Sequence, residues 1–226
     1  MAIVDISDLH KSYTTGSEVT NVLTGLDLKT RDGEMIMIMG PSGSGKTTLL
    51  NILGGIDQSQ KGSITVDGHE ITVLDAKALN EYRRNQVGFI FQFYNLLPTL
   101  TARENVELGL EMLIKDKDEL KERAEKYLLL VGLDDKMENF PQELSAGQQQ
   151  RVAIARALAK EPKLILADEP TGNLDEERAG KIMVMMKRLQ HELKITFVIV
   201  SHNSYLKEYM DRTLTLRRGV LETMDA

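Results

Sequence analysis

A glycine-rich segment at residues 40–47 carries the clearest chemistry in this sequence. It reads Gly40-Pro41-Ser42-Gly43-Ser44-Gly45-Lys46-Thr47, which matches G-x-x-x-x-G-K-[ST]. Glycines let consecutive backbone N–H groups surround phosphate oxygens, a helix N-terminus adds a positive dipole end, and the lysine reaches the outer phosphates. The hydroxyl of Thr47 is suited to hold Mg2+. The segment therefore predicts a nucleoside triphosphate site formed by Gly40, Pro41, Ser42, Gly43, Ser44, Gly45, Lys46, Thr47 and Thr48.

Two further segments combine polar side chains with a strand or helix end. Ser145 is suited to cap the helical segment that follows it, and a helix N-terminus of this kind can form a second anion site. The apolar run Leu164–Ala167 ends in Asp168 and Glu169. Standing alone, the first segment reads as an ordinary capped helix and the two acids read as solvated loop residues.

The elements that must position these residues follow from the apolar periodicity. Alternating apolar residues predict two half-buried antiparallel strands at Ile3–Leu9 and Val19–Leu28, joined by a polar turn that contains Gly16. A strand at Glu34–Met39 enters the glycine-rich loop, and a helix at Lys46–Leu53 ends at a pair of glycines. The glycine-rich loop is thus expected between a strand and a helix, where its mechanism requires it.

The remaining pattern is that of a sheet with helices on its faces. Short apolar runs, each followed by a polar or helical stretch, recur at Val87–Phe91, Leu164–Ala167 and Phe197–Val200. The alternating methionines at positions 35, 37 and 39 fit the core packing of a buried strand. Between Thr101 and Glu143 the strand signal disappears and charged segments alternate with leucines at helical spacing, which predicts an inserted helical lobe.

Length and composition set limits on partners and compartment. The chain has 226 residues and a formal charge of −6, with 34 acidic against 28 basic side chains, so we expect one catalytic unit and no general attraction for nucleic acid. The absence of cysteine excludes a disulfide framework and a thiolate metal site. We expect no signal peptide, and no apolar stretch approaches the roughly 20 residues of a membrane-spanning helix.

Leu144-Ser145-Ala146-Gly147-Gln148, with the helical segment that follows as far as Leu158, resembles the signature segment of ABC-type ATPases. Ala146 stands where most family members have a second glycine. The resemblance covers essentially the whole chain, with the motifs in family order. It implies an α/β fold of the P-loop NTPase class, with a RecA-like core, an N-terminal antiparallel β-subdomain and an inserted α-helical subdomain. The expected division places the core in 1–100 and 163–226 and the helical signature subdomain in approximately 101–162, within one ABC ATPase domain.

The same resemblance implies roles for individual residues. Asp168 resembles the Walker B aspartate, which binds Mg2+ through water, and Glu169 resembles the catalytic glutamate that polarises the attacking water. His202 resembles the switch histidine at the γ-phosphate, and Gln92 resembles the Q-loop glutamine that reaches Mg2+. Tyr13 matches the aromatic residue that stacks on adenine, although strand-end packing competes as an explanation for it. The remaining implied positions are Lys46 in catalysis, Thr47 on the metal, Asp175 in the D-loop, and Ser145, Ala146, Gly147 and Gln148 contacting ATP from the second subunit.

The implied function is that of the ATP-hydrolysing subunit of an ABC transporter. The chain holds one phosphate loop and one signature segment, so two chains, most simply two copies, must meet around ATP. The segments Gln92–Thr101 and Asp168–Asp175 look most like the subgroup that serves lipoprotein release, macrolide export and cell division. The expected partners are ATP, a second ATPase subunit and an integral membrane permease, with Mg2+ as cofactor. The expected location is the cytoplasm, on the inner face of the cell membrane through the permease.

Two other hypotheses assign the protein to a different functional class. A soluble ABC-type ATPase would act without a permease, but such relatives usually carry long coiled-coil insertions, zinc cysteines or two ATPase units per chain, which this sequence lacks. A nucleotide-sensing module with vestigial hydrolysis would not need Lys46, Asp168, Glu169 and His202, which are all present.

Overall fold

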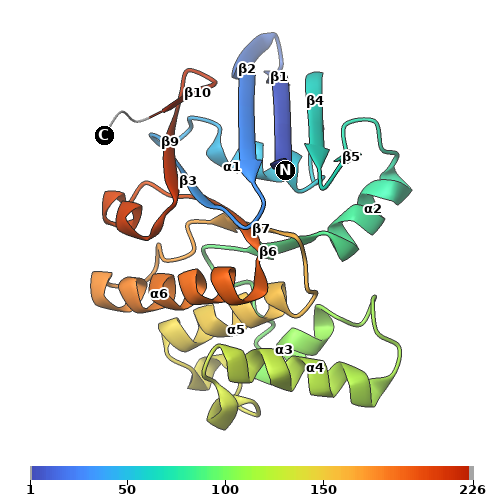
Figure 1. Ribbon diagram of the computed structural model, residues 1–226, viewed down its shortest axis with the longest axis vertical. Coiled ribbons are helices and arrows are strands. Elements are labelled where there is room, and N and C mark those ends of the chain that lie inside the picture. The colour runs from blue at the N-terminus through green and yellow to red at the C-terminus, as the bar shows by residue number, and fades with distance from the viewer. Residues whose placement is uncertain (1, 224–226) are drawn as a thin grey trace.

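Two sheets organise the chain, which is described here by a computed structural model covering residues 2–223. The first is an antiparallel sheet of four strands in the order β2-β1-β4-β5. Its strands are β1 (Ala2–Thr15), β2 (Glu18–Arg31), β4 (Lys61–Val66) and β5 (His69–Glu70). In Figure 1 this sheet forms the upper part of the molecule, with β1, β2 and β4 standing side by side.

The second sheet has six strands in the order β10-β9-β3-β8-β7-β6. All neighbouring pairs are parallel except β10 with β9, which is antiparallel. Its strands are β3 (Met35–Met39), β6 (Val87–Ile90), β7 (Leu164–Asp168), β8 (Thr196–Val200), β9 (Arg212–Arg217) and β10 (Val220–Thr223). Since the strands of a parallel sheet point the same way, the residues that follow β3, β6, β7 and β8 gather at one edge.

The helices lie on both sides of this sheet. They are α1 (Lys46–Leu53), α2 (Ala76–Asn85), α3 (Ala102–Leu108), α4 (Lys117–Leu130), α5 (Ala146–Leu158) and α6 (Glu176–Leu193), with 3-10 turns at Asp134–Lys136, Pro141–Glu143 and Ser204–Tyr209. In Figure 1, α3 and α4 form the bottom of the molecule, α5 and α6 lie between them and the sheet, and α1 lies among the upper strands. The helical lobe therefore packs on the face opposite α1.

Side-chain alternation along the central strand explains why the sheet is covered on both faces. Met35 and Met37 belong to the core shared with α3–α6, whereas Ile36 and Ile38 belong to the core shared with α1 and the antiparallel sheet. All four side chains have no exposed surface. Because successive side chains of a strand point to opposite faces, a continuous apolar run is what a strand buried on both sides requires.

The fold class predicted from the sequence is confirmed: a parallel core, an N-terminal antiparallel sheet and an inserted helical lobe are all present. The N-terminal hairpin is longer than predicted, because polar residues continue β1 and β2 to the turn at Gly16. The predicted helix at Lys46–Leu53 has the observed bounds. The strands β4, β5, β9 and β10 and the helix α2 were not predicted from the sequence. Within residues 2–223, no helix is both long enough and apolar enough to cross a membrane.

A glycine allows β4 to approach β1 closely. Strand β1 has an irregularity between Ser7 and His10, where Asp8 adopts φ 49°. Gly62 lies against it with φ 94°, and a Cβ on Gly62 would be 2.4 Å from the carbonyl oxygen of Asp8. Gly68, just beyond β4, has a similar φ of 77°, but no atom of residues 2–223 other than its two chain neighbours lies within 4 Å of the position of an added Cβ. A side chain at either position would strain the backbone, but only at Gly62 would it also clash with a neighbour, so comparing the two separates these effects.

Replacing each glycine with alanine should therefore give unequal losses of stability. Gly68→Ala carries only the strain of a positive φ, about 1 kcal/mol. Gly62→Ala adds a clash with main chain that cannot move aside, so we expect a loss above about 3 kcal/mol. Urea unfolding followed by circular dichroism measures both free energies of unfolding. Equal losses at the two positions would show that Gly62 is not needed for close approach.

Candidate active site

The glycine-rich segment forms the loop between β3 and α1, as predicted. Gly45 caps α1 with φ 100°, and a Cβ there would be 2.7 Å from a methyl carbon of Val22, so β2 packs directly behind the loop. The N–H of Ser44 donates to the carbonyl of Pro41 at 3.2 Å, and the N–H of Leu49 donates to the carbonyl of Gly45 at 2.9 Å. The helix thus begins within the loop, and its first residues, Lys46, Thr47 and Thr48, carry N–H groups that have no partner within the helix.

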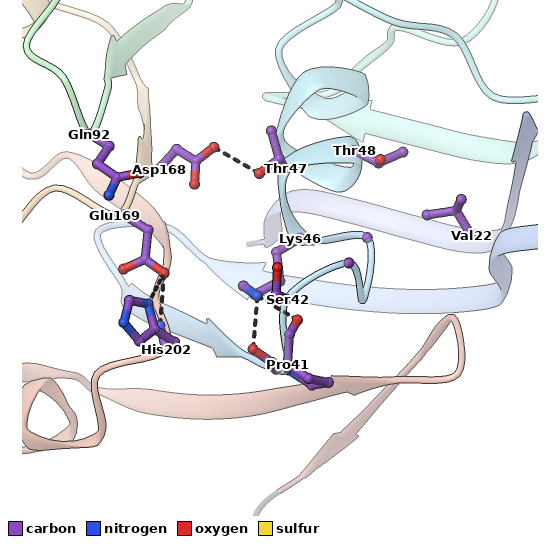
Figure 2. Close-up of a pocket in the computed structure, with 13 residues that line it drawn as sticks. Val22, Pro41, Ser42, Lys46, Thr47, Thr48, Gln92, Asp168, Glu169 and His202 are labelled. Carbon is purple, nitrogen blue, oxygen red and sulfur yellow. Dashed lines mark hydrogen bonds and ion pairs between the residues drawn. The ribbon is translucent and has the colours of Figure 1, made fainter. Parts of the chain in front are cut away.

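Lys46 folds back over this loop. Its Nζ donates to the carbonyl of Gly40 at 2.8 Å and to the carbonyl of Pro41 at 3.0 Å. These two bonds place the ammonium group in the mouth of the loop rather than in bulk solvent, as Figure 2 shows. A cation held here lies where the negative charge of a bound triphosphate would be greatest.

The loop opens into a cavity of about 600 Å³ that unites most of the predicted residues. Figure 2 shows two sides: the loop with Thr47, Thr48 and Val22 on one, and Gln92, Asp168, Glu169 and His202 on the other. The lining is Val22, Gly40, Pro41, Ser42, Gly43, Gly45, Lys46, Thr47, Thr48, Gln92, Asp168, Glu169 and His202. Segments far apart in the chain meet here because they follow neighbouring parallel strands.

Thr47 and Asp168 form the part of the cavity that fits Mg2+. The Thr47 hydroxyl donates to Oδ2 of Asp168 at 2.9 Å. Burial raises the pKa of Asp168 above its ordinary value and the charge of Glu169 adds to this, while the Thr47 hydrogen bond and Lys46 oppose it. A nearby cation would favour the charged carboxylate. The adjacent hard oxygens, with the Gln92 amide in the same lining, are the donor set that Mg2+ takes alongside phosphate oxygens.

Glu169 is held by the residues that follow β8. Its Oε2 accepts a hydrogen bond from the Ser201 hydroxyl at 2.8 Å, and its Oε1 accepts from the His202 backbone N–H at 2.9 Å. The Nδ1 of His202 is 2.6 Å from the same Oε1. Glu169 itself has φ 45°, a left-handed conformation that is costly for a residue with a side chain. The carboxylate is therefore oriented by several contacts at once, beside the loop that carries Lys46.

Gln92 enters the cavity from the loop after β6, and two side chains hold that loop. Asn173 donates from Nδ2 to the carbonyl of Gln92 at 2.7 Å. Arg156, on α5, donates to the carbonyls of Tyr94 at 2.7 Å and Asn95 at 2.6 Å. These contacts join the Gln92 loop to the segment after β7 and to the helix that carries the signature.

The signature segment lies outside this cavity. Ser145 caps α5: the Gln148 N–H donates to its Oγ at 3.4 Å, and the Ser145 N–H donates to the Gln148 side chain at 2.8 Å. Ala146 occupies the first helical position without a positive φ, so the residue that differs from the family pattern fits without strain. Ser145, Gly147 and Gln148 line a second cavity of about 220 Å³ with Arg151 and cationic side chains of α6. Asp175 caps α6, accepting from the Arg178 N–H at 2.9 Å.

Some predicted residues lie beside the main cavity rather than in its lining. Tyr13 is on β1 and partly exposed, and its side chain turns toward the segment after α1. The Ser44 hydroxyl is buried under the loop with no hydrogen-bond partner in residues 2–223. Val22 was not predicted as a site residue, because hairpin geometry brings it to the loop and no local pattern marks it. The contact from Ser201 was not predicted either, since the only signal for it is its position before His202.

Comparison with known proteins agrees with this geometry. The sequence profile described as ABC transporter matches residues 23–172. The chain is 46% identical over 220 residues to the lipoprotein-releasing system ATP-binding protein LolD of Pseudomonas fluorescens, covering 97% of both chains. It is 40% identical to the bacitracin export ATP-binding protein BceA of Halalkalibacterium halodurans, covering 99% of this chain and 88% of the relative.

Solved structures agree as well. A dimeric structure of the ATP-binding cassette MJ0796, in a post-hydrolysis state bound to ADP and Pi, superimposes with a TM-score of 0.88 at 40% identity and covers 99% of each chain. The fold and site therefore define an ATP-binding cassette. The chain belongs to the ABC transporter family, as an ATP-binding subunit.

Removing the Lys46 ammonium should weaken nucleotide binding strongly. Lys46 brings an ammonium group to the lining of the main cavity. A charge-assisted hydrogen bond from such a group to a phosphate contributes about 10-fold to 100-fold to the binding affinity. Calorimetric titration of Lys46→Ala with Mg-ATP measures this loss. Lys29→Ala is the matched control, since Lys29 is exposed, pairs with Asp5 and should leave the affinity unchanged. Wild-type affinity in Lys46→Ala would exclude Lys46 from the phosphate site.

Proposed function

We propose that this chain hydrolyses Mg-ATP at an interface between two ATPase subunits and so drives a membrane-embedded permease. The observation that carries the proposal is the single cavity shared by the phosphate loop, Asp168, Glu169 and His202. Binding alone would need only the loop. A carboxylate in the same cavity as that loop is what water activation adds.

The chemistry follows from the side chains of the cavity. The loop N–H groups and Lys46 bind the β- and γ-phosphates and stabilise charge as the γ-phosphoryl group leaves. Mg2+, when bound at Thr47 and Asp168, neutralises phosphate charge. Glu169 accepts a hydrogen bond from the attacking water and draws its proton, while His202 keeps the carboxylate in place and reaches the γ-phosphate. Ser201 takes part as a further orienting contact.

The separation of the signature from the main cavity supports a composite site. The cavity lined by Ser145, Gly147 and Gln148 has no lining residue in common with the cavity that contains Lys46 and Glu169. Their helix N-terminus can therefore serve phosphates only from outside, as a second subunit would present it. The relative MJ0796 is described as dimeric with ADP and Pi bound, which supports the same arrangement for this chain, with Asp175 near the interface.

The transport role has separate support. The relatives are named for lipoprotein release and bacitracin export, and the first agrees with the proposed subgroup of lipoprotein release, macrolide export and cell division. Phe93, directly after Gln92, leaves 72% of its surface exposed, and Met112, beyond α3, leaves 63% exposed. An exposed apolar side chain in the Gln92 loop and another in the helical lobe suit contact with a permease. The helical lobe, approximately 101–162, would carry closure of the two subunits to that permease at the inner face of the membrane.

Glu169→Gln is the test, because the amide keeps the shape and loses the carboxylate. We expect hydrolysis to fall at least about 100-fold while Mg-ATP affinity is retained. Uncleaved ATP should then hold two chains together, giving an ATP-dependent dimer. Adding Ser145→Arg should return the protein to a monomer, since a bulky cation then blocks the signature side. Phosphate release and size-exclusion chromatography with light scattering report both properties.

The control is Glu81→Gln, on α2, where the carboxylate pairs with Arg84 on the surface. It should hydrolyse ATP at the wild-type rate and form no stable dimer. Wild-type turnover in Glu169→Gln would exclude its catalytic role. An inactive Glu169→Gln protein that stays monomeric with ATP would leave the chemistry standing and exclude the composite site.

A further inference from the structure

A buried lysine on β1 makes an ion pair with the segment that follows α1. Lys11 leaves 7% of its surface exposed, and its Nζ donates to Oδ1 of Asp57 and to the carbonyl of Gln58, both at 2.7 Å. A charged ammonium that is taken out of water requires such partners. Burial tends to raise the pKa of Asp57, but the hydrogen bonds from Lys11, Tyr13 and the Gln58 N–H outweigh it and hold that pKa below its ordinary value. Asp57 is therefore a carboxylate with both oxygens engaged.

The second oxygen of that carboxylate holds Tyr13. The Tyr13 hydroxyl donates to Oδ2 of Asp57 at 2.7 Å. The Nζ of Lys11 lies over the tyrosine ring, 4.8 Å from its centroid, which is within cation–π range. The ring is thus fixed at its hydroxyl end and over one face, yet 43% of the residue remains exposed. A restrained aromatic ring with free surface can receive another planar group at little loss of entropy.

The backbone next to the ring is fixed as well. Gln60 also connects the segment after α1 with β1. Its Nε2 donates to the carbonyl of Ser12 at 2.8 Å, and its Oε1 accepts from the Ser12 N–H at 3.0 Å. On the other side, the Asp57 N–H donates to the carbonyl of Asn51 in α1 at 3.1 Å. The chain of contacts therefore runs from Tyr13 through Asp57 to the helix that begins at Lys46.

We propose that Lys11 and Asp57 are positioning residues that hold the Tyr13 ring at a set place relative to the phosphate loop, so that one ATP reaches both. Tyr13 pairs with Thr20 on β2, and Val22, farther along β2, lines the phosphate cavity. Tyr13 thus lies across from a β2 residue two positions before Val22, and we expect a base attached to the bound phosphates to emerge on this side of the cavity. The inference rests on the proposed function, ATP binding at this loop, and on the adenine-stacking role that the family resemblance implies for Tyr13.

The alternative is that the Lys11–Asp57 pair stabilises only the fold. The two accounts differ for a ligand that has phosphates but no base. If the pair positions Tyr13, its loss should weaken Mg-ATP and leave inorganic tripolyphosphate unaffected. If the pair is only structural, damage to the loop should affect both ligands alike.

The experiment is calorimetric titration of the full chain with Mg-ATP and with Mg-tripolyphosphate. Asp57→Asn keeps the side-chain volume and one acceptor oxygen, so Lys11 is not left without a partner. We expect its Mg-ATP affinity to fall about 3-fold to 10-fold with tripolyphosphate affinity unchanged. Tyr13→Phe keeps the ring but loses the hydrogen bond to Asp57, so it should show a similar loss of Mg-ATP affinity. Asp5→Asn is the matched control, since it removes another lysine-paired carboxylate of β1 and should bind both ligands like the wild type.

Tyr13→Ala separates this inference from the function on which it rests. It should weaken Mg-ATP at least as much as Asp57→Asn, and the double variant should be no weaker than Tyr13→Ala alone. If Tyr13→Ala weakens Mg-ATP but Asp57→Asn does not, the positioning role is wrong and adenine stacking stands. Wild-type Mg-ATP affinity in Tyr13→Ala would overturn both. Equal weakening of ATP and tripolyphosphate in Asp57→Asn would make the pair structural and overturn the inference.

Discussion

The register of three parallel strands is the constraint on which the site depends. In β3, β8 and β7, Ile38 pairs with Val200 and Val200 pairs with Asp168. The ladder continues one residue past the strands: the Ser201 N–H donates to the carbonyl of Ile38 at 3.2 Å, and the Glu169 N–H donates to the carbonyl of Val200 at 2.9 Å. Backbone hydrogen bonds therefore set the spacing between the phosphate loop, the two acids and the residues after β8. A slip of one residue in any strand would turn these side chains to the other face.

Burial of the sheet on both faces makes that register rigid. One core joins the sheet to the helical lobe, and the other joins it to α1 and the antiparallel sheet, so neither face is free to shift alone. The adjustable parts are the loops beyond the ladder. Arg156 of α5 holds the loop after Gln92, which links the signature helix to the cavity without passing through the sheet. The Gln92 loop is therefore tied both to the helical lobe, through Arg156, and to the segment after β7, through Asn173.

The sequence predicted those features that are encoded by neighbouring residues. The loop at residues 40–47, the signature cap at Ser145 and the strand before Asp168 are each specified by a short segment, and the structure contains all three elements. The contacts that remained hidden join residues distant in the chain. Asp57 meets Tyr13 and Val22 meets Gly45 because the antiparallel sheet folds over α1, which no local pattern encodes. The strands β5 and β10 were missed for a related reason: they are short, and pairing rather than periodicity defines them. Strands β4 and β9 do alternate, with Ile64 and Val66 buried in the first and Leu214 and Leu216 in the second, so their signal was present in the sequence and was overlooked.

A crystal structure of the protein with Mg2+ and a non-hydrolysable ATP analogue would show directly whether the edge of the parallel sheet is the site. We expect the Lys46 Nζ to leave the carbonyls of Gly40 and Pro41 for an oxygen of the terminal phosphates. We also expect a metal ion beside Thr47 and Asp168, with the backbone pairing of β3, β8 and β7 unchanged. Triphosphate bound away from the loop, or a metal ion that does not lie near Asp168, would contradict the claim that the edge of the parallel sheet forms the site.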